Sequence, residues 1–288
     1  MLARLGSAAR GLHRRDLGDW TEPTLRRALE GAEGVIHSAS VVHRPGTPSA
    51  EYTRFNVEGT RALVEAARAA GVKRFVFMSS IKVHGEMPAG VIDEHTPVAA
   101  EADYARTKAE AERIVLAASD LRPVVLRLCP VYGRGDKGNV RTVIRAIARR
   151  RFFVPGDGST RKSIVHVSTV ADVVRAASEK DATGVFVVAD RHAPSMRELA
   201  DTIAKLLGRR RPLSIPRPIL RGTAALVGRA ARAARIKTPV SGELIDKAMT
   251  SSVCDPSRAE RELGVTCSVD LEEALAEEIH WLRSVRAL

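Results

Sequence analysis

The segment VKRFVFMSSIKVHGE at residues 72–86, followed after a loop by DYARTKAEAE at residues 103–112, decides how this chain is organised. The apolar run at residues 75–78 has the composition of a buried strand. It ends in two small hydroxyl residues, Ser79 and Ser80. A strand, a connection and a helix in series are the repeating unit of a parallel sheet.

A candidate chemical site follows from the spacing inside this unit. We expect the helix to open at Tyr104, and residues four apart share one helix face, so Tyr104 and Lys108 point the same way. The hydroxyl at the carboxyl end of the strand is expected to meet them there. A hydroxyl, a phenol and an ammonium together make a proton-transfer site that needs neither a metal nor a thiol.

The same alternation of strands and helices runs through most of the chain. Strands alternating with helical segments of this length indicate βαβ units and a parallel sheet, in which ligands lie beyond the carboxyl ends of the strands. After Pro194, helices predominate. The predicted strands are 34–40, 75–78, 123–128, 163–167 and 184–188, and the predicted helices are 22–30, 56–70, 103–119 and 139–151.

Composition narrows the class of protein. At 288 residues the chain can bury an ample core. No apolar run is long enough to span a membrane, and the first residues lack the apolar block of a signal peptide. Cys129, Cys254 and Cys267 are far apart and show no metal-ligand spacing, so we interpret them as reduced packing thiols of a cytoplasmic protein and expect no metal.

The net charge of +12 has two interpretations. One is binding to nucleic acid or to a membrane surface, and the other is a basic cleft for a phosphorylated small molecule. Scattered arginines, few aromatic residues and no nucleic-acid motif favour the second. A helix predicted at residues 219–236 carries Arg221, Arg229, Arg232 and Arg235 on one side, which suits a surface helix and leaves a membrane-surface or partner role open.

One GxGxxG pattern occurs, at residues 133–138, after a strand and before a helix. We interpret it as a decoy, because it lies in mid-chain, contains charged residues and has no acidic residue closing a strand about 20 residues later. A loop that shapes a substrate pocket explains it better.

Several further blocks join the central segment in a fixed order, and together they carry a resemblance. The chain resembles the extended short-chain dehydrogenases, the NAD-dependent epimerase/dehydratase family, most of which act on nucleotide sugars. The blocks are Asp16-Leu17, Val35 to Ser40, Asn56 to Thr60, Lys73 to Ser80, Val83 to Gly85, Tyr104-x-x-x-Lys108, Arg127 with Pro130 to Gly133, Gly156 to Gly158, Val165 to Val167, and Asp255 to Gly264.

The resemblance implies an α/β fold with a Rossmann-like parallel sheet and a smaller, mostly helical substrate lobe. The sheet part would comprise residues 1–132 and about 163–192, and the lobe about 133–162 and 193–288. The family begins with a strand, a glycine-rich phosphate loop and a helix. By that analogy we expect roughly 30–40 residues of the pattern to be missing before Met1.

The resemblance also assigns roles. Tyr104 is the expected acid/base, Ser80 the catalytic hydroxyl in preference to Ser79, and Lys108 the charge that lowers the pKa of the phenol. Asn56 is expected to brace the backbone, and the isolated histidines are expected to be structural. The implied residues for NAD (or NADP) are Asp16, Leu17, Ser38, Ala39, Ser40, Tyr104, Lys108, Pro130 and Val131, and those for substrate are Ser80, Asn139, Arg161 and Lys162.

Sequence also bears on the reaction. The family's 4,6-dehydratases carry Asp-Glu after the catalytic hydroxyl, whereas Ile81 and Lys82 follow Ser80 here. This disfavours dehydration and leaves reversible oxidation at one sugar carbon. The segment Ser79 to Val83 resembles a subgroup that makes amino-sugar precursors of surface polysaccharides, in which epimerases and reductases both occur. Our main expectation is C4 epimerisation of a UDP-hexose through a 4-keto intermediate. The alternatives left open are an NAD(P)H-dependent reductase of a 4-keto-sugar or of another ketone such as a steroid, and a non-catalytic dinucleotide-responsive binding protein. We expect a nucleotide-sugar ligand, no nucleic acid, no integral membrane segment and a homodimer.

Overall fold

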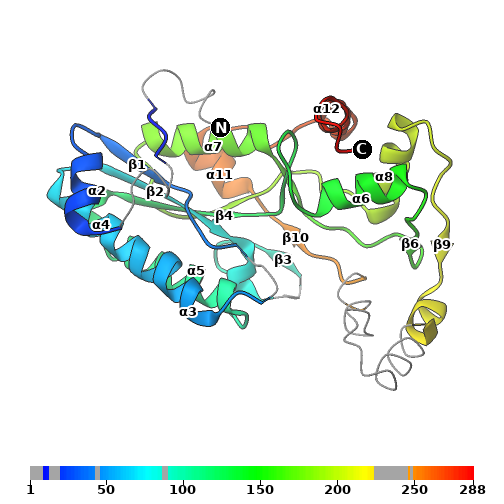
Figure 1. Ribbon diagram of the computed structural model, residues 1–288, viewed down its shortest axis with the longest axis horizontal. Coiled ribbons are helices and arrows are strands. Elements are labelled where there is room, and N and C mark those ends of the chain that lie inside the picture. The colour runs from blue at the N-terminus through cyan, green and yellow to red at the C-terminus, as the bar shows by residue number, and fades with distance from the viewer. Residues whose placement is uncertain (1–8, 13–19, 43–45, 86–89, 224–245, 247–248) are drawn as a thin grey trace.

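A four-stranded parallel sheet forms the centre of the fold (Figure 1). The computed structural model describes residues 9–12, 20–42, 46–85, 90–223, 246 and 249–288. The order of strands in the sheet is β1-β2-β4-β8. Their bounds are β1 Gly34–His37, β2 Arg74–Ser80, β4 Pro123–Leu128 and β8 Gly184–Val188.

Both faces of this sheet are covered, which explains its continuous apolar strands. Phe75, Val76 and Phe77 are at most 1% exposed, as expected of central parallel strands buried on two sides. One face packs on α2, α4 and α5, and the other on α7 and α11. These helices are α2 Glu22–Ala28, α4 Gly59–Ala69, α5 Asp103–Leu116, α7 Val167–Glu179 and α11 Ser257–Leu263.

Most of the predicted elements occur, with shifts at their ends. β4 and β8 match the predicted bounds, and β2 extends through both serines. The predicted strand 163–167 is wrong in extent, because only β7 (Val165–His166) is extended and it pairs with β5 (Val131–Tyr132) outside the central sheet. Helix α7, which begins at once after β7, was not predicted.

The helix predicted at 56–70 consists of two kinds of helix. A π-helical segment, η2 (Thr53–Glu58), follows α3 (Ser49–Tyr52) and leads directly into α4. π-Helical turns are rare and occur frequently at functional sites. Here the segment contains Asn56, whose side chain accepts a hydrogen bond from the amide of Val41 in the loop that follows β1.

A separate apolar cluster lies beside the sheet and belongs mainly to three helices, α6 (Asn139–Ala148), α8 (Met196–Leu206) and α12 (Leu271–Ser284). Ser195 and Glu198 form a reciprocal cap on α8, and such caps stabilise a helix start. On this basis we propose the predicted two-part division, with one change: the segment around residues 253–267, predicted to belong to the lobe, goes with the sheet. Residues around β10 (Val253–Cys254) and α11 pack on the sheet core.

The remaining elements are short strands and 3-10 turns. β6 pairs with β9, and β10 pairs with β3, each in parallel. The bounds are β3 Val91–Ile92, β6 Val154–Pro155 and β9 Ser214–Ile215, with short 3-10 turns η3 Ile81–His84 and η4 Ser119–Leu121.

Two composition-based expectations can be compared with the structure. All three cysteines are buried free thiols, as predicted for packing residues. Among the described helices, none is both long and apolar enough to cross a membrane. Of the predicted helix 219–236, residues 217–223 belong to a helical segment and residues 224–236 lie outside the described part of the chain.

Candidate active site

Three predicted ligand-facing segments lie at one edge of the sheet. Residues 38–40 follow β1, Ser80 ends β2, and residues 130–131 follow β4. These strands are neighbours and run parallel, so their carboxyl ends meet at the same edge. Ser38, Ala39, Pro130 and Val131 are exposed there, although the strands that lead to them are buried.

Ser80 and Tyr104 come together at this edge. Ser80 is the last residue of β2, and its Oγ accepts a hydrogen bond from the Lys82 amide at 3.3 Å. Tyr104 lies in the first turn of α5 and is half-buried. Burial raises the pKa of its phenol, and a hydrogen bond with the Ser80 side chain acts in the opposite direction. The phenol therefore holds its proton at neutral pH.

Lys108 lies one turn further along α5 and is only 3% exposed. Its Nζ donates to the Met78 carbonyl at 2.6 Å and lies 4.4 Å from the centre of the Phe77 ring. Burial lowers the pKa of Lys108 to about 7, which Glu112 partly opposes. We expected this lysine to lower the pKa of Tyr104. The structure instead shows a raised phenol pKa and an ammonium bound to the backbone of β2.

A buried polar network lies beneath these residues, and Glu112 is its centre. Ser79 Oγ donates to Glu112 Oε1 at 2.5 Å, and Arg127 Nη2 donates to Oε2 at 2.8 Å. Arg127 also contacts His84 Nε2 at 3.3 Å. Glu112 was missed at the sequence level. The sequence did contain a clue to Glu112, because it lies four residues after Lys108 and so shares one face of α5 with that lysine.

Asn56 anchors the segment after β1. Its Oδ1 accepts from the Val41 amide at 2.7 Å and from Ser40 Oγ at 3.1 Å. Its Nδ2 donates to Thr107 Oγ1 at 3.1 Å and so links this segment to α5. The expectation that Asn56 braces the backbone is confirmed.

The glycine loop at 133–138 has its amides occupied by protein carboxylates. The Gly133 amide donates to Glu278 Oε2 at 3.1 Å, and the Gly138 amide donates to Asp136. A Cβ on Gly133 would lie 2.7 Å from His166 Nε2, so the glycine is required by close packing. This arrangement supports interpreting the loop as a decoy rather than a pyrophosphate cradle.

The predicted substrate residues lie on the lobe side. Asn139 is the exposed first residue of α6. The Arg161 guanidinium donates to the Ala193 carbonyl at 2.8 Å, and Lys162 is half-buried in a bridge with Ser252. In the described part of the chain, neither Asn139 nor Arg161 hydrogen-bonds the residues at the sheet edge.

The predicted adenine-contacting residues, Asp16 and Leu17, lie outside the described residues.

Comparison with known proteins agrees with this geometry. The family model described as "NAD dependent epimerase/dehydratase family" matches residues 2–189. The chain belongs to that family. The resemblance predicted from sequence and the Rossmann-like fold class are thereby confirmed, and the family is one of NAD-dependent enzymes.

The relatives span several chemistries. A UDP-glucose 4-epimerase of Vibrio cholerae is 32% identical over 61% of this chain, and the chain spans only 57% of that enzyme. Sterol demethylase protein B of Methylococcus capsulatus is 31% identical over 90% of this chain and 81% of its own length. Among solved structures, MoeE5 in complex with UDP-glucose and NAD is 28% identical with a TM-score of 0.71, covering 91% of this chain and 83% of that one.

The residues at the sheet edge fit a dinucleotide. The exposed side chains of Ser38, Ala39 and Pro130 are small, so a flat ring can approach the backbone closely at the carboxyl ends of the strands. The loop at 133–138 fits a pyrophosphate poorly, because carboxylates already accept the amide protons of Gly133 and Gly138, and the Asp136 amide donates to the Gly133 carbonyl.

Proposed function

We propose that this protein interconverts the C4 epimers of a UDP-hexose with NAD as cofactor, through a 4-keto intermediate. The observation that carries the proposal is the hydrogen-bonded pair Ser80 and Tyr104 at the carboxyl edge of β2, with Lys108 one helical turn away. Ile81 and Lys82 form the turn after Ser80. No acidic pair stands there for the additional proton transfers of a dehydration.

Each residue has a role in this proposal. Ser80 Oγ orients the C4 hydroxyl of the sugar. Tyr104, deprotonated when the positive charge of the bound ligands stabilises its phenolate, takes the hydroxyl proton during oxidation and returns it after inversion. Lys108 supplies a nearby positive charge and a contact for the ribose. NAD, when bound, would supply reversible hydride transfer at C4. Ser38, Ala39, Ser40, Pro130 and Val131 would hold NAD.

The proposed substrate contacts are Asn139, Arg161 and Lys162. Arg161 is exposed, yet its guanidinium is anchored by the Ala193 carbonyl. An anchored guanidinium loses little side-chain freedom on binding, which suits a diphosphate clamp. A homodimer, a cytoplasmic location and a part in surface-polysaccharide synthesis stay predictions.

The proposal is tested by incubating the protein with NAD⁺ and UDP-glucose, UDP-galactose or their N-acetylamino forms. We expect NMR to show inversion at C4 without net change in absorbance at 340 nm. Tyr104→Phe serves as the matched control, because it removes the acid/base and keeps the ring. Absence of C4 inversion with every sugar would refute the epimerase proposal.

A second candidate, an NAD(P)H-dependent ketone reductase, is favoured by one comparison. The similarity to sterol demethylase protein B covers 90% of this chain, against 61% for the UDP-glucose 4-epimerase. The same three residues would then donate a proton to a ketone oxygen. Consumption of NADH or NADPH with a keto-sugar or a 3-ketosteroid, and none with UDP-hexoses, would identify this reaction. Dinucleotide binding without turnover of any of these substrates would support a non-catalytic binding protein.

A further inference from the structure

The C-terminal end of α6 places three arginines in a row at the surface. The helix closes with the Arg150 amide donating to the Ile147 carbonyl at 2.9 Å and the Arg151 amide donating to the Ala146 carbonyl at 2.8 Å. This is a Schellman closure, which requires one residue in the left-handed conformation. That residue is Arg150, with φ of 57°. An arginine is thus held where glycine is usual.

The C-terminal end of α8 has the same construction. The Gly208 amide donates to the Lys205 carbonyl at 3.1 Å, and the Arg209 amide donates to the Ala204 carbonyl at 2.8 Å. Gly208 has φ of 63°. Three arginines, residues 209–211, follow this glycine, as three arginines end α6. In both segments an apolar pair comes next, Phe152-Phe153 in one and Pro212-Leu213 in the other.

These two segments run side by side. β6 and β9 pair in parallel with Val154 opposite Ser214, and the Val154 amide donates to the Leu213 carbonyl at 2.9 Å. The residues just before the two strands are therefore neighbours. Together they line a cavity of about 700 Å³. We call the exposed residues of both segments, Arg149, Arg150, Arg151, Phe153, Arg209, Arg210, Arg211 and Leu213, the arginine surface.

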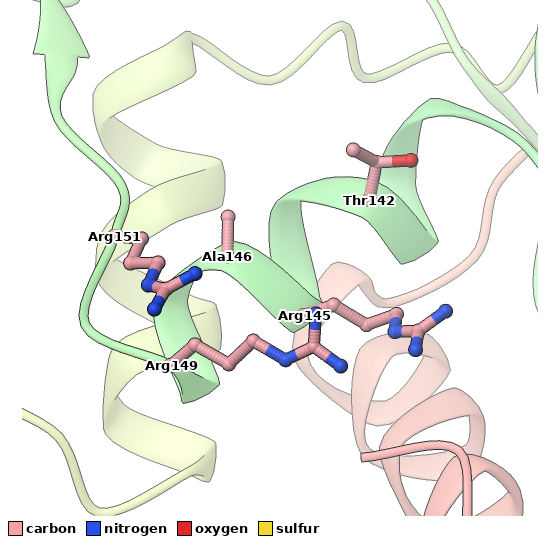
Figure 2. A pocket seen from close by; sticks show the side chains of 5 residues that line it. All are labelled: Thr142, Arg145, Ala146, Arg149 and Arg151. Carbon is pink, nitrogen blue, oxygen red and sulfur yellow. The ribbon is translucent and has the colours of Figure 1, made fainter.

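In the part of the chain that the structure describes, few acidic side chains compensate the charge of the arginine surface. Arg211 pairs with Asp201. Within the described residues, the side chains of Arg149–Arg151, Arg209 and Arg210 have no hydrogen bond or ion pair. Figure 2 shows Arg145, Arg149 and Arg151 gathered around a second hollow, of about 330 Å³, on the last turns of α6. Clustered like charges repel one another, and a bound anion would relieve that repulsion.

Apolar side chains stand among these arginines. Phe153 is 52% exposed and Leu213 is 73% exposed. The neighbouring Phe152 packs on the apolar cluster of α6, α8 and α12, so Phe153 is not needed to fill that cluster. Large apolar side chains exposed together on a folded protein mark interaction surfaces.

We propose that the arginine surface docks on an anionic lipid bilayer, with the guanidinium groups on lipid phosphates and with Phe153 and Leu213 inserted between the headgroups. Basic side chains gain from the surface potential of anionic lipids, and apolar ones gain by leaving water. A polynucleotide would satisfy the arginines and would leave Leu213 in water. The bilayer accounts for both kinds of residue, and this inference is independent of the reaction proposed above.

The test is cosedimentation of the full chain with vesicles. We expect binding to phosphatidylglycerol-containing vesicles, weak binding to pure phosphatidylcholine, and a decrease as salt rises. Each arginine near an anionic surface contributes about a fivefold factor in binding. Replacing Arg149, Arg150, Arg151, Arg209 and Arg210 by Gln is therefore expected to weaken partition at least about a hundredfold.

The matched control removes equal charge elsewhere. Its five substitutions, also to Gln, are at the exposed residues Arg26, Arg27, Arg61, Arg113 and Arg283. We expect this variant to keep most of the wild-type binding. An equal loss in both variants would show a net-charge effect and would overturn the proposal.

Two further outcomes bear on the proposal. The double variant Phe153→Ser and Leu213→Ser is expected to bind several-fold more weakly, and unchanged binding would overturn the inserted-side-chain model. Preferential binding of single-stranded RNA over vesicles, lost in the five-arginine variant, would assign the surface to a polynucleotide and would overturn it too.

Discussion

Glu112→Gln should cost the protein a large part of its stability. Glu112 and Arg127 form an ion pair at 2.8 Å with side chains only 3% and 7% exposed, and the substitution leaves the Arg127 charge buried without its partner. Breaking one side of a buried pair costs about 3–5 kcal/mol. At about 2–4 °C per kcal/mol, the unfolding midpoint should fall by roughly 6–20 °C. Thermal and urea unfolding followed by circular dichroism measure both quantities.

A surface ion pair with the same separation serves as the control that distinguishes the effect of burial from the effect of losing a partner. Arg68 and Asp120 are also 2.8 Å apart, but their side chains are 44% and 54% exposed. Asp120→Asn is therefore expected to cost at most about 1 kcal/mol. The double variant Glu112→Gln with Arg127→Met should lose less than the sum of its single variants by about 2 kcal/mol or more, because no unpaired charge remains. Additive losses, or a Glu112→Gln cost equal to that of Asp120→Asn, would refute the reasoning.

Three other predictions concern the proton site and the loop that packs against α12. Tyr104→Phe should lower turnover by at least about a hundredfold, while the free energy of unfolding changes by about 1 kcal/mol. Activity within tenfold of wild type would contradict the acid/base role of Tyr104. Burial raises the pKa of Glu278 from 4.5 to about 7, so the folded protein disfavours the ionised form. The contribution of Glu278 to the free energy of unfolding therefore falls as the pH rises from 4.5 to about 7. Glu278→Gln should flatten this slope in urea unfolding between pH 5 and pH 8, and an unchanged slope would exclude Glu278 as its source. Gly133→Ala places a Cβ 2.7 Å from His166 Nε2 at a φ of 113° and should lower the free energy of unfolding by more than about 2 kcal/mol. Gly71→Ala, which has open space around its Cβ, should lower it by about 1 kcal/mol. Equal losses in the two variants would speak against the clash with His166.

The local sequence pattern was sufficient to predict those strands whose apolar composition reflects burial on both faces. β4 and β8 are continuous apolar runs that match the predicted bounds, because parallel strands covered by helices on both faces must be apolar on both faces. The positions of Ser80 at the end of β2 and of Tyr104 and Lys108 on α5 could be predicted, because a strand end and a helical spacing of four are both visible in a sequence. Their catalytic roles stay predictions.

Other features depend on contacts that no local pattern shows. Helix α7 was missed because its valine-rich sequence fits a buried strand as well as a buried helix, and tertiary packing decides between them. The Glu278 contact with Gly133 joins residues 145 positions apart. Glu112 resembled an ordinary surface carboxylate until Arg127 and Ser79 were placed beside it.

The placement of Lys108 changes the role expected of the proton site. Burial lowers the pKa of Lys108 to about 7, and its Nζ donates to the Met78 carbonyl at 2.6 Å rather than to the Tyr104 phenol. Burial meanwhile raises the pKa of Tyr104, so the described residues alone keep the phenol protonated. Abstraction of a sugar proton then depends on positive charge that arrives with the bound ligands. Within the protein, Glu112 opposes the lowering of the Lys108 pKa and so favours the charged form of that lysine.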